Sequence, residues 1–230
     1  MFMKYYGIEI FKDIDQNFEE EISRYSKLVS FKKKDTPFLN NELLKYFYIV
    51  LKGRIKTYQI NINSGKEQTI FIYKKRDMFD TIILLDGKSH DVMYEVLEDV
   101  VLLELPIEKV REWLRKNENF NKIFFPYIAS QMRHTEELAT DISLYSTYER
   151  LTKIILQSIN PNNHHYYKLL QNLSKTEIAK LLGTIRHVIE RHLKSLEKKN
   201  IIENKRKNIS IKDTYKLLQE SENLLMSYSK

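Results

Sequence analysis

The chain of 230 residues contains no Cys and only five Gly and four Pro. Without Cys it forms no disulfide, no thiolate zinc site and no cysteine-ligated iron–sulfur cluster, and so few Gly disfavour Gly-rich nucleotide-binding loops. The N-terminal residues lack the apolar core of a signal peptide, and no apolar run approaches the roughly 18 residues of a membrane span. We therefore expect a soluble cytoplasmic protein with no membrane partner.

The net charge of +7 is distributed unevenly along the chain. Residues 1–115 hold 19 Lys and Arg against 19 Asp and Glu, residues 116–147 hold 3 against 4, and residues 148–230 hold 16 against 8. Positive charge concentrated in this way is typical of a surface that meets phosphates, although charged helices are also common on proteins that bind no nucleic acid. Charge alone leaves both interpretations open.

The segment from about Tyr46 to Leu105 has the short period of β-strands. Its β-branched and aromatic runs are separated by Gly53, by the turn Asn63-Ser64-Gly65 and by other charged or Gly-containing turns. Because parallel strands would need intervening helices and none is evident, we expect an antiparallel roll or small barrel. The predicted strands cover residues 46–51, 55–60, 69–73, 81–85, 92–97 and 100–105.

Helical spacing follows the predicted sheet. One helix is expected to start at Pro106, and a second to run from about Asn119 to Tyr145. Residues on the longer helix recur at spacings of 7, 3, 4 and 3, which is typical of a seam between two helices. We favour a dimerisation helix over the alternative of one amphipathic helix lying on its own domain. The predicted seam residues are Ile128, Thr135, Leu138, Ile142 and Tyr145.

The segment Leu173–Glu197 has the pattern of two short helices joined by a tight turn. Ser174 and Glu177 are spaced as a capping box, and Gly183 can take the positive φ of a turn. This arrangement predicts a helix-turn-helix whose second helix enters the DNA major groove. That helix has an expected buried face of Ile185, Ile189, Leu193 and Leu196, and an opposite, polar face of Arg186, His187, Glu190, Arg191 and Lys194.

A β-hairpin is expected after these two helices. Ile201-Ile202 and Ile209-Ser210-Ile211 flank a basic turn that contains Lys205 and Arg206. The tip of such a wing can contact backbone phosphates. The stretch Thr214–Tyr228 is expected to form an extra helix, with a frayed tail as the alternative.

In this order of elements the chain resembles the cyclic-AMP receptor protein/FNR superfamily of bacterial transcription regulators. The resemblance extends from about residue 10 to residue 212 and is most specific in Leu173–Ile202. It implies an α+β fold with an N-terminal antiparallel β-roll, similar to a cyclic-nucleotide-binding jelly roll. The β-roll sensor domain would cover residues 1–115, a long dimerisation helix residues 116–147, and a winged helix-turn-helix with the extra C-terminal helix residues 148–230.

The resemblance also implies a function and the residues that carry it. Arg186 and Arg191 match base-contacting residues of the family, Ser174 and Lys175 match a phosphate-contacting pair, and His187 replaces a Glu that many members have. We expect a homodimeric regulator, not an enzyme, that binds a palindromic site in double-stranded DNA, with RNA polymerase as a further candidate partner. The alternative is a β-roll ligand-binding or protein-interaction module whose helical domain docks a partner.

The sequence does not identify an effector. In the stretch that corresponds to the family's phosphate-binding turn, Gly is absent, Ile82 replaces a Glu, and His90 stands near the place of an Arg. Asp80 and Asp91 would repel a phosphate, so cyclic AMP is disfavoured. An FNR-type iron–sulfur cluster is excluded by the absence of Cys. Haem with His90 as its ligand stays open beside the interpretation of His90 as a surface residue, and no other metal site is expected.

Overall fold

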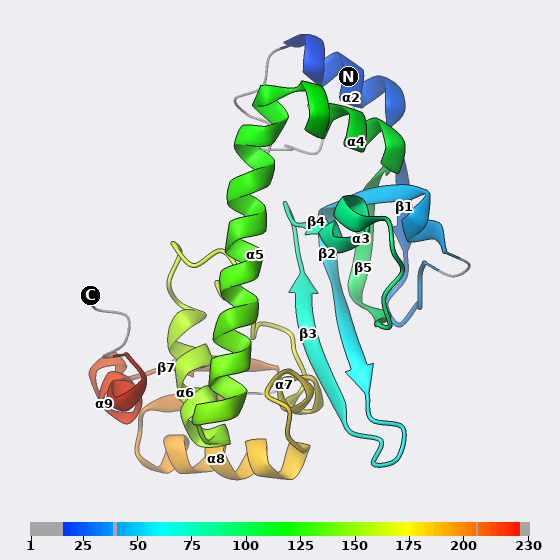
Figure 1. Cartoon of the computed structure of the whole chain (residues 1–230). Helices are drawn as coiled ribbons and strands as arrows, with labels where there is room; N and C mark the ends of the chain where they lie inside the picture. The colour runs from blue at the N-terminus through cyan, green and yellow to red at the C-terminus, as the bar shows by residue number, and fades with distance from the viewer. Residues whose placement is uncertain (1–15, 39–40, 206, 226–230) are drawn as a thin grey trace. The chain divides into compact units, whose positions relative to one another are not determined.

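The computed structural model describes residues 16–38, 41–205 and 207–225. Contacts between Cα atoms divide this part of the chain into two compact units. The first comprises the described residues up to Gln59 together with Ile70–Met132, and the second comprises Ile60–Thr69 and the described chain from Arg133 onward. The long helix α5 (Glu118–Leu144) contributes to both units (Figure 1). The architecture is α+β, as predicted.

A sheet forms most of the first unit. Its strands follow the order β1-β5-β2-β3, and β4 pairs with β2. The pairings of β5 with β1 and with β2, and of β4 with β2, are antiparallel, which confirms the predicted type of sheet. Figure 1 shows β2 and β3 as two neighbouring strands that run side by side. The strands are β1 (Lys27–Phe31), β2 (Tyr46–Ile60), β3 (Glu67–Tyr73), β4 (Met78–Phe79) and β5 (Met93–Pro106).

The two longest strands are continuous where the sequence predicts breaks. Gly53 lies within β2, where a φ of 80° accompanies shifts of register against β5 between Val50 and Ile55. A side chain at Gly53 would overlap the backbone carbonyl of Asp99, so this position accommodates a bulge that only Gly can form without displacing the neighbouring strand. The two runs at 92–97 and 100–105 likewise belong to one strand, and the prediction of separate strands is wrong.

The predicted strand at residues 81–85 is also wrong, because these residues form the short helix α3 (Thr81–Asp86). The neighbours Ile83 and Leu84 are both buried, whereas neighbours in a strand point to opposite faces. The helix ends at Gly87, whose N–H bonds to the carbonyl of Ile83. A short apolar run does not by itself distinguish a buried strand from a helix, which is the reason for the error.

The helices of the first unit contribute aromatic side chains to its core. Helix α4 (Ile107–Lys116) starts directly after Pro106, as predicted, and α5 follows it after one residue. The ring of Phe18 packs edge-on against Trp113, with 5.0 Å between ring centroids, and Phe120 of α5 packs against both. The unit also contains α2 (Gln16–Tyr25) and a 3₁₀ turn, η2 (Glu42–Leu44).

The second unit contains the predicted helix-turn-helix and wing. Ser174 and Glu177 form the expected capping box, and Leu193 and Leu196 of the second helix are fully buried. Ile185, predicted to share this buried face, is 64% exposed because it precedes the helix in extended conformation. The elements are α6 (Thr147–Gln157), α7 (Lys175–Leu181), α8 (Arg186–Lys198), β6 (Ile202–Lys205), β7 (Asn208–Ile211) and α9 (Thr214–Leu225). The end of the predicted last helix, residues 226–228, lies outside the described residues.

Candidate nucleic-acid interface and sensor site

A tight turn joins α7 to α8 and fixes the direction in which α8 begins. The side-chain oxygen of Ser174 accepts from the N–H of Glu177 at 3.2 Å, and the Glu177 carboxylate accepts from the N–H of Ser174 at 2.6 Å. Both bonds satisfy backbone groups that the first helical turn would otherwise leave without a partner. At the other end of α7, Gly183 adopts a φ of 62°, and Thr184 donates its N–H to the carbonyl of Ala179. The chain therefore enters α8 in a defined direction.

Helix α8 has one apolar face and one polar face. Ile189, Leu193 and Leu196 are completely buried. Four of the five predicted polar residues are exposed, and Glu190 is partly exposed. The two faces follow the 3.6-residue period of one amphipathic helix, so the polar side chains point away from the core together. The exposed four are Arg186, His187, Arg191 and Lys194.

Arg186 and Glu190 form an ion pair one turn apart on this polar face. The Arg186 Nε atom lies 2.7 Å from Glu190 Oε1. The hydrogen bond from Arg186 holds the pKa of the Glu190 carboxyl below its ordinary value, so Glu190 is ionised at neutral pH. In the absence of DNA, this ion pair therefore holds the Arg186 side chain along the surface of α8.

Three lysines from separate segments line one hollow beside α7. Lys175 at the first position of α7, Lys205 at the end of β6 and Lys207 in the wing turn share it with apolar residues of α7 and α8. The wing is fixed there because the Asn172 N–H donates to the carbonyl of Lys207 at 3.0 Å. Lys207 was not among the predicted site residues, although its place in the basic turn could have indicated it. The predicted Arg206 lies outside the described residues.

Helix α5 carries an apolar stripe that neither unit covers completely. Among its large apolar residues, Phe125 is 57% exposed, Met132 62% and Ile142 47%. Together with Ile128, Thr135 and Ala139 they recur at alternating spacings of 3 and 4, which is the heptad pattern of helices that pack along each other. We call this set the α5 stripe: Phe125, Ile128, Met132, Thr135, Ala139 and Ile142.

The α5 stripe overlaps the predicted dimer seam only in part. Ile128, Thr135 and Ile142 belong to both sets. Leu138 and Tyr145 of the predicted seam are partly buried, as Ile128 is, and do not belong to the series of positions that defines the α5 stripe. The predicted seam does not contain Phe125, Met132 and Ala139. Dividing the seven-residue step between Ile128 and Thr135 gives Met132, and one further step toward the N-terminus gives Phe125. The role of these residues in dimerisation stays a prediction.

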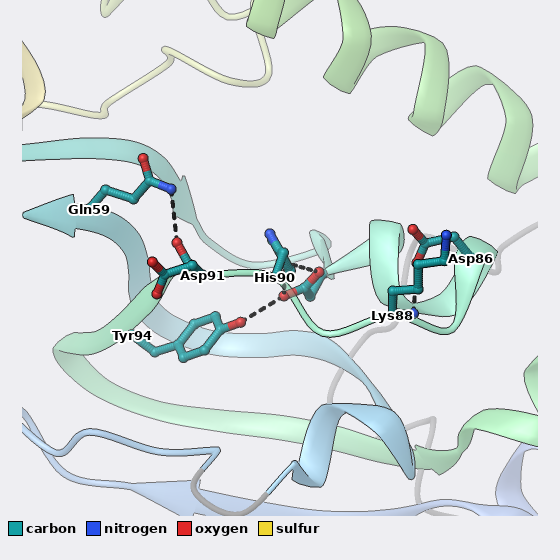
Figure 2. A network of polar contacts seen from close by, with 7 residues as sticks. Gln59, Asp86, Lys88, His90, Asp91 and Tyr94 are labelled. Carbon is teal, nitrogen blue, oxygen red and sulfur yellow. Dashed lines mark hydrogen bonds and ion pairs between the residues drawn. The ribbon is translucent and has the colours of Figure 1, made fainter.

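In the first unit, His90 belongs to a polar network around a buried carboxylate (Figure 2). The Asp80 side chain is only 3% exposed, and each of its oxygens lies 2.9 Å from His90 Nε2. Tyr94 donates its hydroxyl to Asp80 Oδ2 at 2.9 Å. The hydrogen bond to Asp80 raises the pKa of His90 above its ordinary value, so the imidazolium form is favoured next to the carboxylate.

Aromatic rings pack against this network in the interior of the sheet domain. Phe79 lies 4.6 Å from Tyr73, 4.9 Å from Phe38 and 5.5 Å from Tyr94, measured between ring centroids. Asp80 follows Phe79 directly and adopts a φ of 50°, a left-handed conformation that is uncommon for residues other than Gly. Strain of this kind persists only where surrounding contacts hold it, and here the contacts of the Asp80 carboxylate do so.

No group of three or more metal-ligating side chains occurs within residues 16–38, 41–205 and 207–225. Over the same ranges, none of the helices has both the length and the apolar character needed to cross a membrane.

Comparison with known proteins gives a consistent identification. Residues 28–117 match the family model of the cyclic nucleotide-binding domain, and residues 149–220 match that of the Crp-like helix-turn-helix domain. A global nitrogen regulator of Nostoc sp. is 24% identical over 79% of this chain and 83% of its own length. A CRP-like cAMP-activated global transcriptional regulator of Mycobacterium tuberculosis is 20% identical, covering 92% and 96% of the two chains.

The fold agrees with these matches. The structure of FixK2 from Bradyrhizobium japonicum superposes with a TM-score of 0.72 at 18% identity, covering 84% of this chain and 96% of FixK2. The two matched domains lie in the same order as the sheet domain and the helix-turn-helix described above. The chain therefore belongs to the Crp/Fnr family of DNA-binding transcription regulators and is not an enzyme.

Proposed function

We propose that this regulator is a homodimer that binds a palindromic DNA site, with one α8 helix in each of two major grooves. The polar face of α8 carries the proposal, since Arg186, His187, Arg191 and Lys194 are exposed while the opposite face is buried. A helix that is anchored on one face and presents long donors on the other has the form that major-groove reading requires.

The residues proposed to contact DNA have two roles, base reading and phosphate binding. Arg191 can donate two hydrogen bonds to the O6 and N7 atoms of a guanine, and Arg186 can do the same once it leaves Glu190. Lys175, Lys205 and Lys207 surround a hollow next to α7 and supply positive charge for phosphates, which position the protein without reading sequence. Ser174 at the start of α7 and Lys194 add further contacts of this second kind.

Two-fold symmetry would come from the α5 stripe. Burial of Phe125, Met132 and Ile142 against their counterparts in a second chain would remove apolar surface from water. A symmetric pair of chains reads the same half-site twice, with the half-sites about 34 Å apart, or one helical turn of DNA.

We further propose that cyclic AMP is not the effector of this chain. Its phosphate would have to approach the Asp80 carboxylate, which is buried and already bound by His90 and Tyr94. Haem binding through His90 is also disfavoured, because Nε2 of that residue is bound to Asp80. Isothermal titration calorimetry with cyclic AMP should give no heat of binding at micromolar concentrations, and a measurable micromolar affinity would contradict this part of the proposal.

Selection from a random DNA pool tests the main proposal. Duplexes retained by the purified chain should converge on a palindrome, and their affinity should fall steeply as salt concentration rises, because phosphate contacts release counterions. Selection without enrichment, or of sequences that lack two-fold symmetry, would contradict it. RNA polymerase is a candidate partner, to be tested by transcription from a promoter that carries the selected site.

A further inference from the structure

The junction between α5 and α6 contains a buried ion pair. The Lys153 side chain on α6 is 1% exposed, and its Nζ atom lies 2.7 Å from Oδ1 of Asp141 on α5, whose side chain is 14% exposed. Both residues belong to the second unit, in which Figure 1 shows α6 beside the C-terminal part of α5. A lysine so completely removed from water is tolerated only when a partner compensates its charge.

Further polar groups surround the pair. Glu137, one turn before Asp141 on α5, is near enough to Lys153 for their charges to interact, and its carboxylate accepts a hydrogen bond from the Tyr166 hydroxyl at 3.4 Å. Burial raises the pKa of Glu137 above its ordinary value. Arg150 on α6 also interacts electrostatically with Asp141. Charged groups from both helices therefore meet at this junction.

The connection between the two helices does not by itself fix their angle. Only Tyr145 and Ser146 separate α5 from α6, and the capping box of Ser146 with Glu149 defines where α6 begins. If α6 rotated against α5, Lys153 would move away from Asp141, its 2.7 Å partner inside the junction. Breaking a buried ion pair costs more than loss of an apolar contact, so such rotated arrangements are penalised.

This junction lies between the two surfaces that the proposed function requires. The later residues of the α5 stripe, Thr135, Ala139 and Ile142, belong to the same compact unit as the recognition helix α8. Asp141 and Ile142 are adjacent and so point about 100° apart around the helix axis. One face of α5 is thus available to a second chain while another holds α6.

We infer that Lys153 and Asp141 are positioning residues that set the distance between the two recognition helices of the dimer. The inference rests on the proposed function, since there is a distance to set only in a dimer that reads two half-sites. Because the two side chains are 1% and 14% exposed and bound to each other, the pair acts on the spacing of the half-sites that the protein accepts and leaves the affinity for one half-site unchanged.

The test compares three DNA probes. They are the palindrome selected by the wild-type chain, the same duplex with one base pair inserted at its centre, and a duplex with a single half-site. Wild type should bind the inserted duplex at least tenfold more weakly than the palindrome. Lys153→Met should reduce this difference to less than threefold while its affinity for the single half-site stays within twofold of wild type. Equal discrimination in variant and wild type, or an equal loss on all three probes, would overturn the inference.

Two additional variants separate positioning from stability. Lys56→Met removes an equally buried lysine, 2% exposed and paired with Glu95 at 2.9 Å, from the sheet of the first unit. This variant should leave spacing discrimination at the wild-type value. If Lys153→Met does not fold, Lys153→Met/Asp141→Leu replaces it, because an apolar pair leaves no buried charge. Tenfold discrimination retained by the folded double variant, or lost by Lys56→Met, would also overturn the inference.

A spin label provides a readout that needs no DNA. Since the chain has no Cys, Lys198→Cys at the exposed end of α8 introduces a single labelling site in each protomer. The distance between protomers should be narrowly distributed in this background and broad when Lys153→Met is added, and equal distributions would overturn the inference. If the wild-type chain selects no palindrome and the label reports no second protomer, the proposed function fails as well. If both of those tests succeed and Lys153→Met matches wild type, only the positioning role fails.

Discussion

The sheet domain and helix α8 use their charged side chains in opposite ways. In the sheet domain Asp80, Lys56 and Arg54 are buried, and each is bound by a partner within the same domain. On α8, Arg191 and Lys194 extend into solvent. A buried charge has to be paired for the fold to tolerate it, whereas a charge left in water is available to an outside partner. Buried, paired charges maintain the shape of the sheet domain, whereas exposed charges on α8 are accessible to an outside partner.

The largest effect is expected from a residue that maintains the shape of the sheet. Gly53→Ala places a methyl group against the backbone of Asp99 at a positive φ, and should lower the free energy of unfolding by about 3 kcal/mol. Gly65→Ala is the control, because its φ is also positive but no atom lies within 4 Å of the added Cβ. Thermal or urea unfolding measures both. Equal losses in the two variants would assign the effect to backbone conformation and not to the close approach of the strands.

A charge placed in the α5 stripe tests whether that surface serves assembly. Met132→Glu should weaken dimerisation by about 2–3 kcal/mol, since it replaces an apolar side chain that the dimer would bury. Arg133→Glu adds acidic charge at the next residue, off the stripe, and should change dimerisation little. Analytical ultracentrifugation across a concentration series provides the dissociation constants. A dimer that tolerates Met132→Glu as well as Arg133→Glu would place the interface elsewhere.

Loss of a base-reading arginine on α8 is expected to cost a similar or slightly smaller free energy, measured on DNA binding. Arg191→Ala should weaken binding to the selected palindrome by about 1–3 kcal/mol and relax the preference at one base pair of each half-site. Lys207→Ala, which removes a wing cation, should weaken binding to all sequences to the same extent and reduce the salt dependence by about one ion. Fluorescence anisotropy with matched and random duplexes distinguishes them. An equal loss for Arg191→Ala on both duplexes would place that residue on the phosphate backbone.

The smallest effect is expected on the pH dependence of the free energy of unfolding, through the bond between His90 and the buried Asp80 carboxylate. The pKa of folded His90 is raised by its bond to Asp80, so its contribution is fully present below the unfolded pKa of about 6.5 and is lost as pH rises through the folded value. Because His90 is partly exposed, His90→Asn should cost about 1 kcal/mol at pH 5.5 and less at pH 9. Urea unfolding at the two pH values measures this. A cost that grows with pH would contradict the assignment of His90 as the cation of the pair.

The elements that the sequence predicts correctly are those whose structure is determined by local chemistry. Ser174 and Glu177 form their capping box within four residues, and the wing strands flank a polar turn, so neighbours in the sequence contain the necessary information. The order of these elements along the chain then pointed to the family. The same reasoning predicted the type of the sheet, because antiparallel strands follow one another through short turns.

The errors and omissions arise from contacts between distant residues. Whether residues 81–85 form a strand or a helix depends on what surrounds them, and the burial of Ile83 and Leu84 is not visible in a short apolar run. Asp80 and Tyr94 are fourteen residues apart, and Lys153 pairs with Asp141 across a helix junction. No sequence spacing indicates such pairs, because the fold brings them together.

The ion pair between Arg186 and Glu190 has a consequence for how a target site is scored. An arginine that must leave a carboxylate to reach a guanine also frees that carboxylate to accept from a cytosine amino group. The preferences at the two base pairs are then interdependent, and a matrix that adds independent contributions from each position would misrank operators that differ at both.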